Sequence, residues 1–162
     1  MTPVNPQILE ALNAGIQSEV ASYVFYIEAA KKSQAATFKE LLQKLAMEEK
    51  QHFHVLERQH DSLIRSEKWI STADILKSPG LPEIGEEMSA QHRDLVSRVQ
   101  QATTARAILE LALQLEEAAF ALFKLEAKRS VSSEGKKMYE ELSKFEQGHM
   151  ALIKGMMKEY PA

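Results

Sequence analysis

Two short segments of the sequence repeat the same pair of ionisable residues at the same spacing. Glu49 is followed three positions later by His52, and Glu146 is followed three positions later by His149. Residues three apart lie on the same face of an α-helix, so each pair can direct a carboxylate and an imidazole at one point. Both groups are ligands for divalent transition metals, and the pattern therefore indicates metal chemistry.

Two single glutamates complete the set. Glu19 lies 30 positions before Glu49, and Glu116 lies 30 positions before Glu146. If each stretch folds as an antiparallel helical hairpin, positions 34 and 131 mark the turns. Each glutamate is then 15 residues from its turn, which is about 22 Å at ~1.5 Å per residue. All four carboxylates can therefore converge in one layer.

All six residues interrupt apolar stripes, so we expect the layer to be buried. Four buried carboxylates cannot stay ionised without compensation, and two divalent cations would supply the balancing charge. Oxygen-rich ligation with one imidazole per metal favours iron or manganese over zinc or calcium. One glutamate from each of two helices, with Glu-x-x-His from each of two others, is typical of di-iron carboxylate bundles. We therefore expect two iron ions as cofactors, with manganese as the alternative.

Four long helices must position these residues. Glycine and proline are scarce, and strong helix formers carry apolar residues three and four positions apart. The predicted helices cover residues 6–31, 35–64, 104–129 and 133–159. Short links join them into two antiparallel hairpins, 6–64 and 104–159. The predicted side-chain N-caps are Thr37 with Glu40 as a capping box, Thr103 or Thr104, and Ser132 or Ser133.

Residues 65–103 connect the hairpins and are too long for a simple turn. They include Trp69, which we expect to pack the connection onto the bundle, and a predicted extra helix from Ile84 to Gln101. A crossover of this length can carry the chain from one end of a bundle to the other.

The second hairpin repeats the first at an offset of 97 residues. The offset aligns chemically similar residues: Leu12 with Leu109, Glu19 with Glu116, Tyr23 with Phe120, Tyr26 with Phe123, Leu45 with Leu142, Glu49 with Glu146 and His52 with His149. Two hairpins related by a twofold axis make the second and third helices parallel, and parallel neighbours need a long crossover. The predicted fold class is all-α, a four-helix bundle forming a single domain over residues 1–162.

The chain resembles the ferritin-like di-iron proteins, and most closely the erythrin domain of rubrerythrins. The resemblance rests on Glu19, Glu49-Lys50-Gln51-His52, Glu116 and Glu146-Gln147-Gly148-His149, and on the segment from Glu19 to Tyr26. It covers nearly the whole chain, and residues 65–103 match least well. It implies a ferritin-like bundle whose two irons react with hydrogen peroxide or dioxygen.

The resemblance also implies a role for each residue. Glu49 and Glu146 would bridge the metals, and Glu19 and Glu116 would bind one metal each. Tyr26, seven residues after Glu19, would donate a hydrogen bond beside the ligands and is the candidate catalytic side chain.

The chain departs from rubrerythrins in two ways. It has no cysteine, and therefore no rubredoxin module, so electrons would come from a separate donor protein. Ala119 stands where the family tends to have a further glutamate, which puts the peroxide-linked ligand shift of that family in doubt here.

The neighbouring residues are expected to have structural roles. Glu48 and Glu117 lie about 100° around the helix from the proposed ligands, so we expect them to face solvent, although a rotated helix would exchange either with its neighbour. We expect His54 to face away from His52. His60 and His92 are predicted at the surface, and core packing is predicted for Tyr23, Phe120, Phe123 and Phe145.

Composition excludes several classes of function. The 162 residues include 20 Lys and Arg against 23 Asp and Glu, a net charge of −3. This balance predicts no nucleic-acid partner and no polybasic membrane anchor. Without cysteine there are no disulfides, thiolate zinc sites or iron–sulfur clusters. No secretory signal and no membrane-length apolar run is visible, so we expect a soluble, cytoplasmic protein.

The favoured hypothesis is a di-iron oxidoreductase that reduces hydrogen peroxide and forms a homodimer or higher homo-oligomer. Three alternatives stay open. Iron storage with a ferroxidase centre is one, although no fifth helix follows residue 159, and Lys50 and Gln51 stand where bacterioferritins often have a haem-binding methionine. Oxygenation of an organic substrate would need an access pocket. The last is a helical module that only binds metal or a partner.

Overall fold

The computed structural model describes residues 4–78 and 80–161. Within these residues the chain forms seven α-helices and no strand, which confirms the all-α prediction. The four long helices are α1 (Pro6–Lys32), α2 (Ala36–Ser66), α6 (Ala105–Arg129) and α7 (Ser133–Glu159). Their ends agree with the predicted ranges to within 2 residues. None of the helices in the described residues is long and apolar enough to cross a lipid bilayer.

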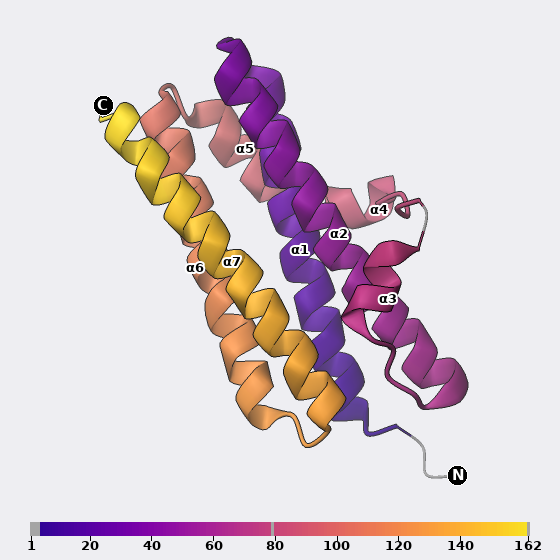
Figure 1. Ribbon diagram of the computed structural model, residues 1–162. Helices are drawn as coiled ribbons and strands as arrows, with labels where there is room; N and C mark the ends of the chain where they lie inside the picture. The colour runs from indigo at the N-terminus through magenta and orange to yellow at the C-terminus, as the bar shows by residue number, and fades with distance from the viewer. Residues whose placement is uncertain (1–3, 79, 162) are drawn as a thin grey trace.

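The long helices pack as two hairpins. Helix α1 lies against α2, α6 lies against α7, and α1 also contacts α6. Figure 1 shows the four helices side by side, with α2 and α6 running in the same direction and the connection passing from one end of the molecule to the other. This arrangement agrees with the twofold relation that the internal repeat predicts.

Two of the long helices have the predicted side-chain N-caps. Thr104 and Ser132 are the N-caps of α6 and α7, and each hydroxyl accepts a hydrogen bond from the backbone N–H three residues later. The predicted capping box of Thr37 and Glu40 is wrong. The N-cap of α2 is Ala35, which has no side-chain cap, because α2 has already begun at position 36 and Thr37 lies inside its first turn.

The connection contains three short helices rather than one. Helix α3 (Thr72–Lys77) was not predicted, and the expected helix from Ile84 to Gln101 is divided into α4 (Glu86–Ala90) and α5 (Arg93–Gln101) by a turn at Gln91 and His92. The turn lets both short helices lie against α1. Lys32 of α1 holds the end of α5, since its Nζ donates to the backbone carbonyls of Val99, Gln100 and Ala102.

Trp69 packs the connection onto the bundle, as predicted. Its indole lies on Gly135 of α7, where an added Cβ would be 2.8 Å from Cζ2 of the ring. The next residue, Ile70, is held by the buried side chain of Gln59, which accepts from its N–H at 2.9 Å and donates to its carbonyl. The absence of a side chain at Gly135 lets the Trp69 ring approach the backbone of α7 closely, which a larger residue would prevent.

Two hydrophobic clusters make up the core, and the Glu and His residues lie between them. On α6, Ile108, Leu109 and Ala112 belong to one cluster, and Ala119, Phe123 and Ala127 belong to the other. Glu116 lies between these two groups. The Glu-x-x-His segment of α2 lies between the clusters in the same order, and that of α7 lies between them in the reverse order, since α7 is antiparallel to α6. The core thus positions one polar layer across the helices.

Candidate metal centre

All six predicted ligands are buried in this polar layer. The four glutamates are 0% exposed, and the two histidines, His52 and His149, are 4% and 8% exposed. Each long helix places its ligand residues at the level along the bundle that the spacing from the hairpin turn predicts. The helical hairpins therefore bring together residues that are up to 130 positions apart in the chain.

The six side chains form two overlapping groups that could each hold a metal ion. Within each group the ligand atoms lie within 4.8 Å of one another. We call them the His52 position, made of Glu19, Glu49, His52 and Glu146, and the His149 position, made of Glu49, Glu116, Glu146 and His149. Glu49 and Glu146 belong to both groups, and Glu19 and Glu116 to one each.

Both histidines direct Nδ1 at the centre. Nδ1 of His52 is 3.0 Å from Oε1 of Glu146 and 3.6 Å from Oε2 of Glu19. Nδ1 of His149 is 3.3 Å from Oε1 of Glu116, and it is 2.7 Å from Oε1 of Glu49 in a contact that is misaligned for a hydrogen bond. In both positions the same ring nitrogen is placed to bind a cation.

Several buried carboxylate oxygens have no hydrogen-bond partner within the described residues. They are both oxygens of Glu19, both oxygens of Glu49, Oε2 of Glu116 and Oε2 of Glu146. Leaving a buried acceptor unsatisfied costs about 1–3 kcal/mol, and more when the group is charged. Such oxygen atoms, facing one another in a buried layer, form a ligand set suited to cations.

Protons take part in the charge balance of this layer. Burial and the charges of Glu146 and Glu49 raise the pKa of Glu19 well above its usual value, and burial with the Glu49 charge raises the pKa of Glu116 to about 10. Burial alone would lower the histidine pKa values, but the neighbouring carboxylates raise the pKa of His52 to about 10 and that of His149 to about 11. Glu116, His52 and His149 therefore hold protons at neutral pH, the shift of Glu19 favours its protonated form, and a metal ion must displace the protons of its ligands to bind.

The pKa of Glu49 is shifted in the opposite direction. Burial pushes its pKa up, but interactions with Glu19, His149 and His52 outweigh burial and lower the pKa well below its usual value. This shared glutamate is therefore ionised in the middle of the layer. A negative charge held between the two positions attracts a cation to either one.

Tyr26 lies where the resemblance implies. Its side chain is fully buried, and its hydroxyl donates a hydrogen bond of 2.7 Å to Oε1 of Glu116. Burial and the charge of Glu116 raise the pKa of Tyr26 well above its usual value, so the hydroxyl keeps its proton. A catalytic role for this residue stays a prediction.

Two neighbours of the site differ from the sequence prediction. Glu48 was expected in solvent, but it is half-buried and its Oε2 lies 2.9 Å from Nε2 of His149. Phe145 was expected in the core, but it is 44% exposed and stacks on the ring of His52 with centroids 5.0 Å apart. The sequence pattern of either helix alone carries no signal for these contacts, because both cross from α2 to α7.

The remaining neighbours follow the predictions in part. Glu117 is exposed, and His54 is buried outside both ligand groups. His60 and His92 are half-buried rather than fully at the surface. Phe123 is in the core, whereas Tyr23 and Phe120 are half-buried at its edge.

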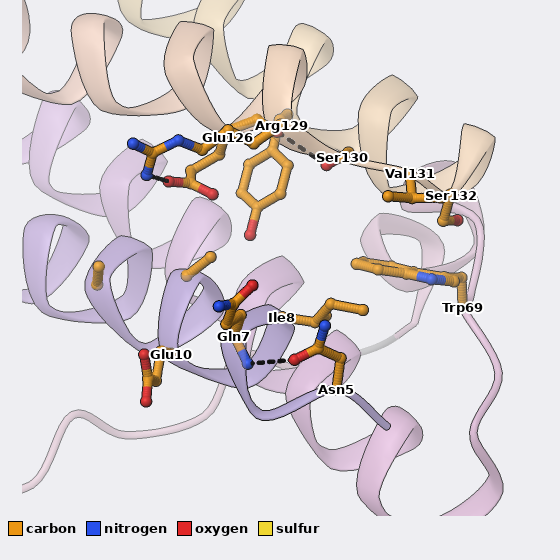
Figure 2. Close-up of a pocket in the computed structure, with 13 residues that line it drawn as sticks. Asn5, Gln7, Ile8, Glu10, Trp69, Glu126, Arg129, Ser130, Val131 and Ser132 are labelled. Atoms are coloured by element: carbon orange, nitrogen blue, oxygen red, sulfur yellow. Dashed lines mark hydrogen bonds and ion pairs between the residues drawn. The ribbon is translucent and has the colours of Figure 1, made fainter. Parts of the chain in front are cut away.

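A cavity of about 630 Å³ lies away from the candidate centre. Figure 2 shows its wall, with Ile8 at the start of α1, Ser132 at the turn between α6 and α7, and Trp69 of the connection. Its lining residues nearest the layer are Ala14 on α1, five positions before Glu19, and Tyr139 on α7, seven positions before Glu146, which is about 8 and 11 Å along the helices. None of the six predicted ligands is among the described residues that line this cavity.

Comparison with known proteins bears on the fold alone. No family model matches the chain, and no curated protein matches it significantly. The chain is similar to a solved structure of a hypothetical protein from Pyrococcus furiosus, with a TM-score of 0.63 and 21% sequence identity. The match covers 93% of this chain and 88% of that chain. It supports the helical architecture over nearly the whole length.

Proposed function

We propose that this chain is a ferritin-like four-helix bundle with a di-iron centre, and that it reduces hydrogen peroxide with electrons from a separate donor protein. The observation that carries the proposal is the pair of overlapping ligand groups that share Glu49 and Glu146. Two shared carboxylates, flanked by one glutamate and one histidine on each side, form the ligand set of a carboxylate-bridged metal pair.

The chemistry of the donor set fits two divalent ions. Raised pKa values favour the protonated form of four groups in the layer: Glu19, His52, Glu116 and His149. Exchanging four protons for two divalent cations leaves the buried charge unchanged. Oxygen-rich ligation with one imidazole per ion suits iron, and manganese is the alternative.

The residues around the centre support a reaction with a small substrate. When bound, two ferrous ions would supply the two electrons that, with two protons, convert hydrogen peroxide to two molecules of water. Tyr26 keeps its own proton and orients Glu116. The two hydrophobic clusters exclude bulk water on either side of the layer. None of the six ligands lines the cavity near Trp69, and we infer a small substrate, peroxide or dioxygen, rather than a large organic molecule.

Metal content is the first test. Anaerobic reconstitution with Fe(II) should yield close to two irons per chain. Glu49→Ala should lose more than one metal equivalent because the residue belongs to both positions, whereas Glu117→Ala, at an exposed position on α6, should lose none. One iron or none in a folded wild-type protein refutes the proposal.

Reactivity is the second test. In stopped-flow measurements the reduced protein should be oxidised faster by peroxide than by dioxygen, and it should turn over only with an added reductase system. Faster oxidation by dioxygen with growth of a mineral core would instead indicate iron storage. Metal binding without either reaction would indicate a binding module.

A further inference from the structure

The internal repeat is chemically unequal at two positions beside the ligands. The offset of 97 residues aligns Tyr26 with Phe123 and Glu48 with Phe145. The first hairpin therefore has a hydroxyl and a carboxylate where the second hairpin has two phenylalanines. The two metal positions are related by the same repeat, so one position has polar neighbours where the other has apolar ones.

Both polar residues act on the His149 position. Oε2 of Glu48 lies 2.9 Å from Nε2 of His149, on the side of the ring away from the centre. The hydroxyl of Tyr26 donates to Oε1 of Glu116 at 2.7 Å. The histidine and the single glutamate of this position each have a hydrogen-bond partner outside the ligand layer.

Among the described residues, the corresponding ligands of the His52 position have apolar neighbours in place of these two partners. Phe145 stacks on the His52 ring at an interplanar angle of 26° and offers no acceptor. Within the described part of the chain, the hydrogen bond of His52 joins its Nδ1 to Glu146 inside the layer, and neither oxygen of Glu19 has a hydrogen-bond partner. Phe123 is fully buried and has no donor.

We propose that the two metal positions are unequal, with the His149 position filled first and the His52 position filled second and emptied first. The inference rests on the two-metal centre proposed above. A carboxylate that accepts from Nε2–H holds the imidazole in the tautomer whose Nδ1 lone pair faces the metal. A hydrogen bond to a ligating carboxylate likewise holds its orientation. Glu48 and Tyr26 are thus positioning residues for one metal of the pair.

Site occupancy tests the order directly. Crystals of protein loaded with one equivalent of Co(II) should show an anomalous peak mainly among Glu116, His149 and the two shared glutamates. Equal peaks at both positions, or a stronger peak beside His52, overturn the inference. No cobalt in either position would instead refute the metal centre itself, so the two failures are distinguishable.

Variants test the cause. Glu48→Leu should weaken the first Co(II) binding step by about 10–100-fold and even out the two anomalous peaks, and Glu48→Gln, which keeps an acceptor, should restore part of the difference. The matched control is Glu40→Leu, at an exposed position on the same helix. Phe145→Glu, at a partly exposed position, should strengthen the second step. Unchanged binding in Glu48→Leu and Phe145→Glu would overturn the assignment.

Discussion

Loading the centre with two divalent ions is expected to release about four protons per chain at neutral pH. Three of the protons come from Glu116, His52 and His149, whose pKa values neighbouring carboxylates raise to about 10, about 10 and about 11. We expect the fourth from Glu19, whose pKa burial and the charges of Glu146 and Glu49 raise well above its usual value. Metal ligands must be deprotonated, so each of these groups gives up its proton when a metal binds.

The proton count sets the pH dependence of affinity. One proton released per binding event changes the binding free energy by ~1.4 kcal/mol per pH unit. Four protons therefore change the total for both ions by about 5 kcal/mol per pH unit, or roughly 10⁴ in the product of the two binding constants. Protons compete with metal, so affinity falls as pH falls below the raised pKa values of about 10.

Calorimetric titration with Co(II) in buffers of different ionisation enthalpy measures the number of protons released. A pH indicator in weakly buffered solution gives an independent value. Glu117→Gln, outside the layer, is the matched control and should release the same number. Release of two protons or fewer, with two metals bound, would refute the protonation states argued here while leaving the ligand assignment intact.

Three further predictions concern stability. The folded pKa values of the two ligand histidines are raised from 6.5 to about 10 and 11, so their stabilisation is complete below pH 6.5 and is lost as pH rises toward the folded values. The melting temperature of chelator-treated protein should therefore fall between pH 6.5 and about pH 10, and a rise would contradict this. Replacing Glu19 and Glu116 together by Leu should stabilise the metal-free protein by about 1–4 kcal/mol and abolish tight metal binding. If the metal-free variant does not melt at a higher temperature than the metal-free wild type, these glutamates do not face an apolar core. Gly135→Ala should destabilise the protein by about 1–3 kcal/mol, because the added methyl group would collide with Trp69. Gly155→Ala, which has open space around it, should instead stabilise α7 by about 0.5–1 kcal/mol. Equal denaturation midpoints for the two variants would show that the Trp69 side chain moves to make room for the methyl group.

The long helices and the composition of the polar layer could be predicted from the sequence. Helical periodicity is local, and the equal spacing of Glu19 and Glu49 about a short turn places both at one height in any antiparallel hairpin. The structure brings these residues together with the second pair as the repeat requires. Their binding of iron stays a prediction.

Only the tertiary structure decided what lies around that layer. The contacts of Glu48 with His149 and of Phe145 with His52 depend on how far α2 and α7 are rotated toward each other. One residue along a helix corresponds to about 100° of rotation. The apolar pattern of one helix therefore does not predict which of its flanking side chains contacts the adjacent helix. The division into α4 and α5 has the same origin, because short helices owe their ends to packing rather than to propensity.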